Sequence, residues 1–385
     1  MDSAQSTPSQ DETSAIGEAS SPVENAVHSS SHQDVSPHSQ IEKLEKKIEA
    51  VDLPDELLSN VLSMTGRLRL IEKENNFFAE YDTLSRYINW VIALPWKNAS
   101  QDILNLDYAQ QTFDKNHHGL QEVKQMILEY LAVMILTRSR LSKEARLRAP
   151  ILSLVGLVGT GKTTIARSIA EALGRKFVRI PFGGMGSAVQ LRGKSRMTPD
   201  SEPGMVIRAL RQAGTNNPVI LLDEIDRVSA EARADIMGVL IELLDPEQNQ
   251  QFVDHFIDYP FDLSNVLFIA TSNNTKDIST AVLDRMQIIQ MPSYNDEEKI
   301  YIAKNYIFPE VLKESGLVPE ELAIEDGVWA EIVRPLGYDS GIRSLKRAMQ
   351  GLVRKVVHYY LTGKITQGKQ FVITQQNLGN FVSQW

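Results

Sequence analysis

A glycine-rich segment at residues 156–163 has the residue types and the spacing of a phosphate-binding loop. It reads Gly-Leu-Val-Gly-Thr-Gly-Lys-Thr, follows an apolar run and precedes a helical pattern, a context that a chance glycine-rich turn lacks. Glycines at this spacing let backbone N–H groups turn towards phosphate, and the helix N-terminus adds positive potential. Lys162 is expected to reach the β and γ phosphates of ATP, and Thr163 to bind Mg²⁺. The residues expected to contact the nucleotide here are Gly156, Leu157, Val158, Gly159, Thr160, Gly161, Lys162, Thr163 and Thr164.

Two acidic residues end the apolar run VILLDEID, downstream of this loop. A buried strand would deliver both side chains to its carboxyl end, where Asp223 is expected to hold Mg²⁺ directly or through water. Glu224 is expected to polarise the attacking water as a general base. A solvated helix N-cap would explain the acidic residues but not the four apolar residues before them.

Three further polar residues are candidates for contact with the γ-phosphate. Asn273 follows the apolar run VLFIATS, and its amide could orient the water or the phosphate if that strand lies beside the one ending at Asp223. The alternative is a turn-forming asparagine. Arg285 in LDRM and Arg343 in GIRSL are candidates for neutralising transition-state charge, because a guanidinium is planar and always charged. The alternative for both arginines is an exposed surface position.

The elements around these residues predict an α/β fold. Four short apolar runs bounded by turn residues, at 151–156, 176–182, 217–226 and 265–272, alternate with helical patterns. That alternation is typical of a parallel sheet covered by helices on both faces. Helical spacing also runs from Ile41 to Ile92, from Asp107 to Thr137, and from Ser293 to about Thr362, before a short extended piece, QFVITQQ. Pro95 ends the first helical region, and Trp96 offers a large apolar anchor.

Composition excludes several classes of function. The chain of 385 residues has no cysteine, so disulfides, thiolate metal sites and a cysteine nucleophile are ruled out. No apolar run approaches the roughly 18 residues that span a bilayer, and the start lacks a signal-peptide pattern, so we expect a cytoplasmic protein without membrane contact. Six acidic residues and no Lys or Arg fall in residues 1–40, which leaves −3 of the net charge of −9 for the remainder. This Ser-rich tail is expected to be disordered.

The order of the motifs resembles the AAA+ ATPase module of Lon proteases, from about Ile41 to the last residue. The likeness rests on strings such as INWVIALPW, HHGLQEVKQMILEYLAV, ALGRKFVRIPFGG, NPVILLDEIDRV, LLDPEQNQQFVDHF, FDLSNVLFIATSN, VLDRM and GIRSLKR. The resemblance implies a P-loop AAA+ sheet sandwiched by helices. The expected divisions are the disordered tail (1–40), a helical N-terminal segment (41–100), the α/β nucleotide-binding subdomain (101–292) and a helical lid (293–385).

The resemblance also implies roles for individual residues and an assembly. It assigns sensor-1 to Asn273, sensor-2 to Arg343 on the lid, and an arginine finger acting on the neighbouring subunit to Arg285. The family forms hexameric rings with ATP between subunits. The segment that the family places near the adenine corresponds here to His117, Gly119 and Leu120, with His118 where the family has Tyr.

Two departures from the family bear on function. The Ser-Lys protease domain that follows the lid in Lon, and the N-terminal substrate domain, have no counterpart in this sequence. The first pore loop reads RGKSRMTPDSEPG, so that Thr198, Pro199 and Asp200 stand in place of the aromatic residue and the small apolar pair. Either Met197 substitutes for the aromatic grip on an extended polypeptide, or the protein does not thread its substrate in the usual way.

Three functions are consistent with these patterns. The first is an ATPase that remodels or captures protein clients, alone or with a separate peptidase. The second is a regulatory or scaffold ring whose nucleotide state controls assembly. The third is DNA-associated ATPase work, with thin support from a basic cluster without interleaved aromatic residues. That cluster consists of Arg138, Arg140, Lys143, Arg146 and Arg148.

Overall fold

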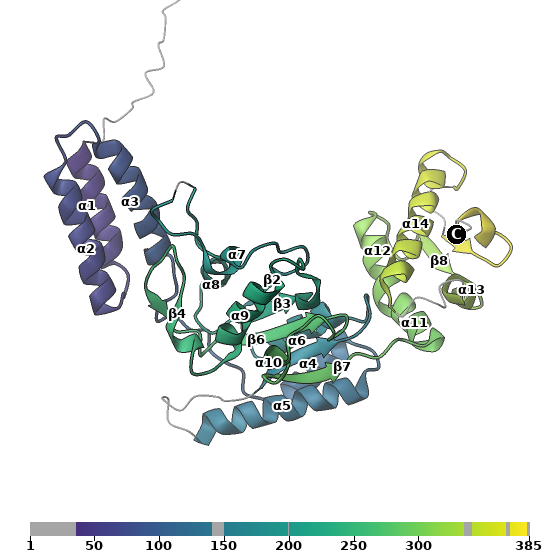
Figure 1. Ribbon diagram of the computed structural model, residues 1–385. Helices are drawn as coiled ribbons and strands as arrows, with labels where there is room; N and C mark the ends of the chain where they lie inside the picture. The colour runs from purple at the N-terminus through teal and green to yellow at the C-terminus, as the bar shows by residue number, and fades with distance from the viewer. Residues whose placement is uncertain (1–35, 141–149, 199, 335–340, 367–369, 383–385) are drawn as a thin grey trace, which may run out of the picture.

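The computed structural model describes residues 36–140, 150–198, 200–334, 341–366 and 370–382. Three regions follow one another along the chain and across Figure 1: a helical arm (α1–α3), a central α/β subdomain, and a helical lid (α11–α14) on the far side from the arm. Most of the predicted tail, residues 1–35, lies outside the described residues, as do Lys143, Arg146 and Arg148 of the basic cluster. No helix in the described ranges combines the length and the apolar character that crossing a bilayer requires.

The arm consists of α1 (Pro37–Glu49), α2 (Asp55–Leu70) and α3 (Phe77–Ile92), which pack against one another. Helix α1 begins four residues before the predicted boundary at Ile41, which corrects the prediction of disorder for 37–40. The reason is a capping signal: the Ser36 hydroxyl accepts a hydrogen bond from Ser39 N at 3.3 Å, and Pro37 occupies the first helical turn.

Apolar contacts join the arm to the α/β subdomain. The Trp96 ring lies 4.9 Å from the Phe261 ring, centroid to centroid, and its indole N–H donates to Val91 O at 2.8 Å. The Tyr87 hydroxyl donates to Ile257 O at 3.1 Å. Buried residues of the arm and of the sheet therefore belong to one continuous core.

The central sheet has five parallel strands in the order β2-β3-β6-β1-β7. Alternate residues face opposite helix layers: Leu221 and Val219 pack in the cluster that contains α4, α5 and α6, whereas Ile220 and Leu222 pack in the cluster that contains α8 and α9. The bounds of the strands are β1 Ile151–Val155, β2 Phe177–Pro181, β3 Val219–Asp223, β6 Leu267–Ser272 and β7 Met286–Gln290. The predicted α/β class is confirmed.

Seven α-helices, two short 3₁₀ helices (Ile225–Arg227 and Asn249–Gln251) and a small hairpin complete the described part of this subdomain. The α-helices are α4 (Leu106–Asn116), α5 (Gln121–Arg140), α6 (Lys162–Ala172), α7 (Val189–Arg192), α8 (Met205–Ala213), α9 (Arg233–Leu244) and α10 (Thr280–Leu283), with β4 (Phe252–Val253) paired to β5 (Pro260–Phe261). The predicted helical region at 107–137 is split into α4 and α5, because Gly119 and Leu120 adopt φ of 65° and 55°.

In the described part of the lid, four α-helices share a core with a two-stranded parallel ribbon. The α-helices are α11 (Asp296–Ile302), α12 (Phe308–Glu314), α13 (Val328–Val333) and α14 (Arg343–Leu361), and the ribbon pairs β8 (Leu322–Ile324) with β9 (Phe371–Ile373). Helix α11 begins with a capping box in which the side chains of Asn295 and Glu298 exchange hydrogen bonds with each other's backbone N–H. This cap gives the chain a defined entry from the sheet into the lid.

Candidate functional site

The glycine-rich loop connects the carboxyl end of β1 to the N-terminus of α6. Gly159 and Gly161 have φ of 85° and 91°, a region that favours glycine. At Gly156 a Cβ atom would lie 2.7 Å from Met291 O, so this position also excludes a side chain. The loop is therefore a backbone surface that opens onto the start of α6, where helix N–H groups favour an anion.

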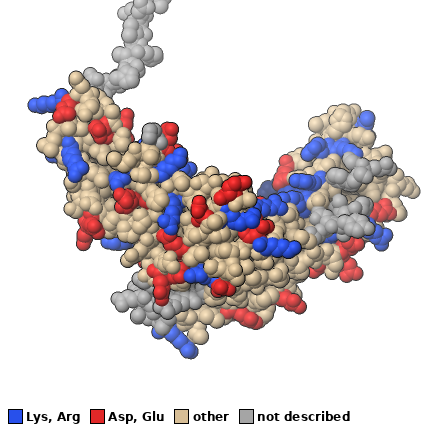
Figure 2. Space-filling model, viewed as in Figure 1, with Lys and Arg blue, Asp and Glu red and all other residues tan. Residues whose placement is uncertain are grey.

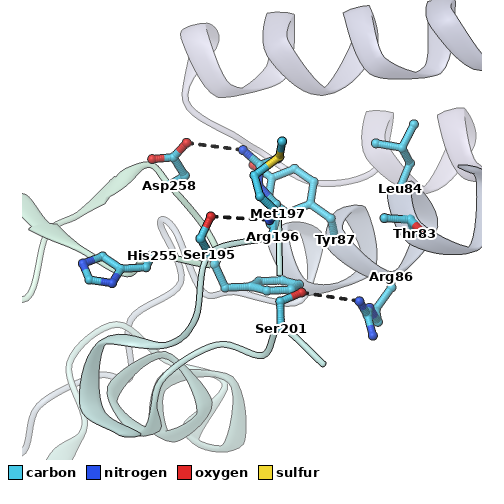
Figure 3. A pocket seen from close by; sticks show the side chains of 11 residues that line it. Thr83, Leu84, Arg86, Tyr87, Ser195, Arg196, Met197, Ser201, His255 and Asp258 are labelled. Atoms are coloured by element: carbon cyan, nitrogen blue, oxygen red, sulfur yellow. Dashed lines mark hydrogen bonds and ion pairs between the residues drawn. The ribbon is translucent and has the colours of Figure 1, made fainter. Parts of the chain in front are cut away.

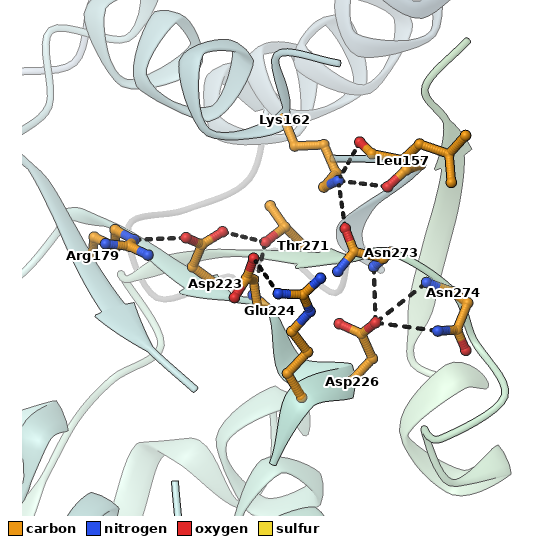
Figure 4. Close-up of polar contacts among 11 residues, drawn as sticks. Leu157, Lys162, Arg179, Asp223, Glu224, Asp226, Thr271, Asn273 and Asn274 are labelled. Atoms are coloured by element: carbon orange, nitrogen blue, oxygen red, sulfur yellow. Dashed lines mark hydrogen bonds and ion pairs between the residues drawn. The ribbon is translucent and has the colours of Figure 1, made fainter. Parts of the chain in front are cut away.

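The Lys162 ammonium group lies between the loop and the end of β6. It donates to Gly156 O at 2.5 Å, to Leu157 O at 2.9 Å and to Asn273 Oδ1 at 3.2 Å (Figure 4). Burial lowers the pKa of Lys162, while the nearby acidic residues, first Asp226 and then Asp223, act to raise it. The pairing of β1 with β6 accounts for this meeting of Lys162 and Asn273. The condition set in the sequence analysis for a role of Asn273, that its strand lies beside the one ending at Asp223, is met by the pairing of β3 with β6.

The two acidic residues at the end of β3 are held by a residue that the sequence analysis missed, Thr271. Its hydroxyl donates a short hydrogen bond to Asp223 Oδ1 and accepts one from the Glu224 backbone N–H at 3.0 Å. Glu224 has a φ of 58°, which is strained for a residue with a side chain. Thr271 thus positions the carboxylate of one acidic residue and the backbone of the next.

Arg179 and Asp226 are two further residues that local sequence patterns did not reveal. Arg179 on β2 binds Asp223, with its Nε 2.6 Å from Oδ2. Asp226 Oδ2 accepts the backbone N–H of Asn273 at 3.0 Å, and the amide group of Asn274 also donates to it at 3.3 Å. These contacts follow from strand order and register, and the signal available in the sequence was only the presence of polar residues at adjacent strand ends.

The lid reaches the loop through the residues that precede α14. Ile342 N–H donates to Gly159 O at 3.1 Å, and a Cβ atom at Gly341 would lie 2.4 Å from Val158 O. The Tyr294 hydroxyl donates to Thr160 O at 3.3 Å, and burial raises the pKa of Tyr294 to about 12. The structure therefore brings Arg343, the first residue of α14, to the loop. Figure 2 shows Lys and Arg side chains gathered over this junction of subdomain and lid, which favours a polyanion.

Arg285 does not join this group of residues. It immediately precedes β7, whose Met286 pairs with Ile151 at the start of β1, the end of the strand opposite the glycine-rich loop. Its guanidinium binds Asp245 Oδ2 at 3.1 Å and Ala281 O at 2.8 Å. Within one chain, Arg285 and the loop thus lie at opposite ends of the parallel strands.

The predicted adenine segment packs against the first turns of α6. His117 is buried, and its Nε2 lies 2.9 Å from Ser168 Oγ on that helix. The His118 ring stacks on Tyr301 of the lid at 3.7 Å between centroids and an interplanar angle of 19°. An imidazole here supplies a flat ring, as the tyrosine of the family would, and it joins the 117–120 segment to α11.

Comparison with known proteins places two family domains on this chain. Residues 152–294 match the model of the ATPase family associated with various cellular activities (AAA), and residues 313–369 match the Lon protease AAA+ ATPase lid domain. The chain is 40% identical over 338 residues to "Lon protease" of Mycoplasma mycoides and 40% identical over 343 residues to "Lon protease 1" of Bacillus subtilis. It is 39% identical over 346 residues to "Lon protease 2" of Thermus thermophilus.

These matches cover most of this chain but only part of each relative. They include 88%, 89% and 88% of this chain, and 41%, 43% and 42% of the respective relatives. The chain therefore spans about two fifths of the length of the curated relatives it matches.

The buried His117 makes stability depend on pH. Burial, and after it the charge of Lys124, lower the pKa of His117 from 6.5 to about 4. Between these values the unfolded chain binds a proton that the folded chain does not, so the free energy of unfolding falls as the pH falls. From pH 7 to pH 5 we expect a loss of about 2 kcal/mol from this group. Urea unfolding at several pH values measures it.

The matched variants are His117→Gln and His255→Gln, since His255 is exposed. His117→Gln should reduce the change in the free energy of unfolding between pH 7 and pH 5. His255→Gln should leave that change as in the parent chain. Equal pH dependence in all three proteins would contradict a neutral, buried His117.

Proposed function

Because the chain contains an AAA ATPase domain followed by a Lon lid domain, we propose that it hydrolyses ATP to remodel or capture protein clients. The observation that carries the proposal is the convergence of Lys162, Asp223 and Asn273 at one edge of the sheet. Lys162 donates a hydrogen bond to Asn273, which directly follows β6, and Thr271 of β6 donates one to Asp223. A phosphate-binding loop after β1, with an acidic residue at the end of β3 and β6 between these two strands, is the arrangement that phosphoryl transfer requires.

The residues fit the magnesium ion that such a nucleotide carries. Thr163 in the first turn of α6 and Asp223 at the end of β3 offer a hydroxyl and a carboxylate, the oxygen ligands that Mg²⁺ prefers. In the described ranges no three His, Asp or Glu side chains form a metal-binding group, so phosphate and water would supply the other ligands. The ion would neutralise charge on the β and γ phosphates.

In the proposed mechanism, Lys162 leaves the carbonyl groups of the loop and binds the β and γ phosphates. Glu224 accepts a proton from the attacking water, and its backbone is fixed for this by Thr271. Asn273 orients the water or the γ-phosphate, and its Nδ2 has no other hydrogen-bond partner among the described residues. Arg343 acts from the lid, so that closure of the lid and hydrolysis are coupled.

We propose that Arg285 completes the site of a neighbouring subunit in a ring, which is hexameric in the family it resembles. Arg285 lies at the opposite end of the strands from the glycine-rich loop. This position suits a head-to-tail interface, in which Arg285 of one subunit faces the loop of the next. Asp245 and Ala281 O hold the guanidinium in one orientation before assembly. His117, Gly119 and Leu120 are proposed to contact the adenine.

A regulatory ring without threading is the second candidate. The observation that favours it is the loop at 193–204, in which Thr198 and Asp200 replace an aromatic and a small residue, and Pro199 lies outside the described residues. Asp200 has a φ of 56°, and Met197 is 92% exposed. The DNA-associated alternative rests on five basic residues, three of which lie outside the described ranges, and it is not proposed here.

Turnover of ATP with and without an unfolded protein distinguishes these functions. If the chain remodels clients, casein should raise the ATPase rate, and the rate per subunit should rise with protein concentration as rings form.

Glu224→Gln should lower kcat by at least about 10²-fold while ATP still binds, because the general base is lost. Glu231→Gln, an exposed position on the following segment, is the control and should match the parent chain. Normal turnover in Glu224→Gln would contradict its role.

Mixing two inactive variants tests the neighbouring-subunit role of Arg285. Lys162→Ala should fail to bind ATP, and Arg285→Ala should lose about 10³-fold in kcat. In mixed rings some interfaces combine an intact loop with an intact arginine, so the mixture should regain activity that neither variant has alone. The control Asp245→Ala removes the partner of Arg285 but keeps the guanidinium. Absence of recovery in rings shown to be mixed would contradict a role across subunits.

A further inference from the structure

A cleft separates helix α3 from the loop at 193–204, away from the nucleotide site. It has a volume of ≈ 510 Å³ and is walled by Leu84, Arg86 and Tyr87 of α3, by Arg196 and Met197 of the loop, and by Phe256 (Figure 3). This volume is in the range of sites that bind small ligands or a few residues of a peptide. Nothing in the proposed ATPase chemistry uses these side chains.

The floor of the cleft is fixed before anything binds. The carboxylate of Asp254 is fully buried and accepts backbone N–H groups of Gly204 at 2.7 Å, Phe256 at 2.8 Å and Ile257 at 3.1 Å. The Tyr87 hydroxyl holds the same turn through Ile257 O. A floor held in this way loses little conformational entropy on binding.

The cleft carries an excess of positive charge. Arg196 binds Asp258, Nη2 to Oδ2 at 3.4 Å, and lies over the Tyr87 ring at 4.1 Å from its centroid, so the Asp258 charge is balanced inside the cleft. Arg86 contacts only a neutral group there, Ser201 Oγ at 3.5 Å, and has no carboxylate partner among the described residues. The cleft thus offers a guanidinium to an anionic group of a ligand.

The remaining surface of the cleft is apolar and adaptable. Tyr87 and Phe256 lie beneath this surface, only 4% and 2% exposed, with 6.1 Å between their ring centroids, and Leu84 and Met197 lie above them on the walls of the cleft. Met197 lies at the rim with 92% of its surface exposed. A flexible, exposed thioether suits apolar side chains of different shapes, as at surfaces that bind many sequences.

We propose that this cleft binds an extended segment of a client polypeptide in which an apolar side chain neighbours a carboxylate. The apolar side chain would lie beside Leu84 and Met197, and the carboxylate would bind Arg86. The inference rests on the proposed function only in taking the ligand to be a client protein.

The test is fluorescence anisotropy of labelled decapeptides with the full chain, without nucleotide. A peptide that alternates Leu or Phe with Glu should bind, and counterparts with Lys for Glu, or Ser for the apolar residues, should bind at least tenfold more weakly. Arg86→Glu should weaken binding of the first peptide at least tenfold and improve binding of the Lys peptide. Arg67→Glu, an exposed site on α2 outside the cleft, is the control and should change neither.

Met197→Ser provides a second variant that cannot disturb the core, because its side chain is exposed, and it should also weaken the Leu and Phe peptides. Equal affinities of parent, Arg86→Glu and Met197→Ser would overturn the proposal. Casein-stimulated ATP turnover without selective peptide binding would contradict peptide binding by the cleft and leave the client-remodelling function in place. Selective peptide binding without casein-stimulated ATP turnover would support peptide binding by the cleft and contradict the client-remodelling function.

Discussion

The parallel register of β1, β3 and β6 is the constraint on which the rest of this structure depends. Strands that run in the same direction end at the same edge of a sheet, so residues distant in sequence arrive together. Val155 pairs with Ser272, and Leu222 pairs with Ala270, which places the glycine-rich loop, Asp223 and Thr271 side by side. A slip of one residue in β6 would turn Thr271 away from Asp223.

This register also explains which parts of the site the sequence could predict. The glycine-rich loop and Asp223 follow recognisable apolar runs, and the position of Asn273 followed once β3 and β6 were taken as neighbours. Thr271 and Arg179 lie within strands, where a polar residue has no local signature. Their function becomes visible only when the residue opposite them is known, because cross-strand contacts depend on pairing and not on spacing along the chain.

The helical parts show the same division between local and long-range information. Apolar periodicity predicted the arm and the lid, but it missed the break at Gly119 and Leu120, since the positive φ values there serve a contact with α6 and the lid. The start of α1 was missed because the composition of the tail outweighed a single capping serine. The pairing of Arg285 with Asp245 joins residues 40 positions apart and had no signal in either segment.

We propose that the loop, Asp223 and Thr163 form one site for ATP with magnesium. Calorimetric titration of ATP into the purified chain, with Mg²⁺ and then with EDTA, tests it most directly. We expect saturable binding that Mg²⁺ tightens at least tenfold, with the gain from Mg²⁺ lost in Asp223→Asn. Affinity that is the same with and without Mg²⁺, or the absence of any binding, would contradict it.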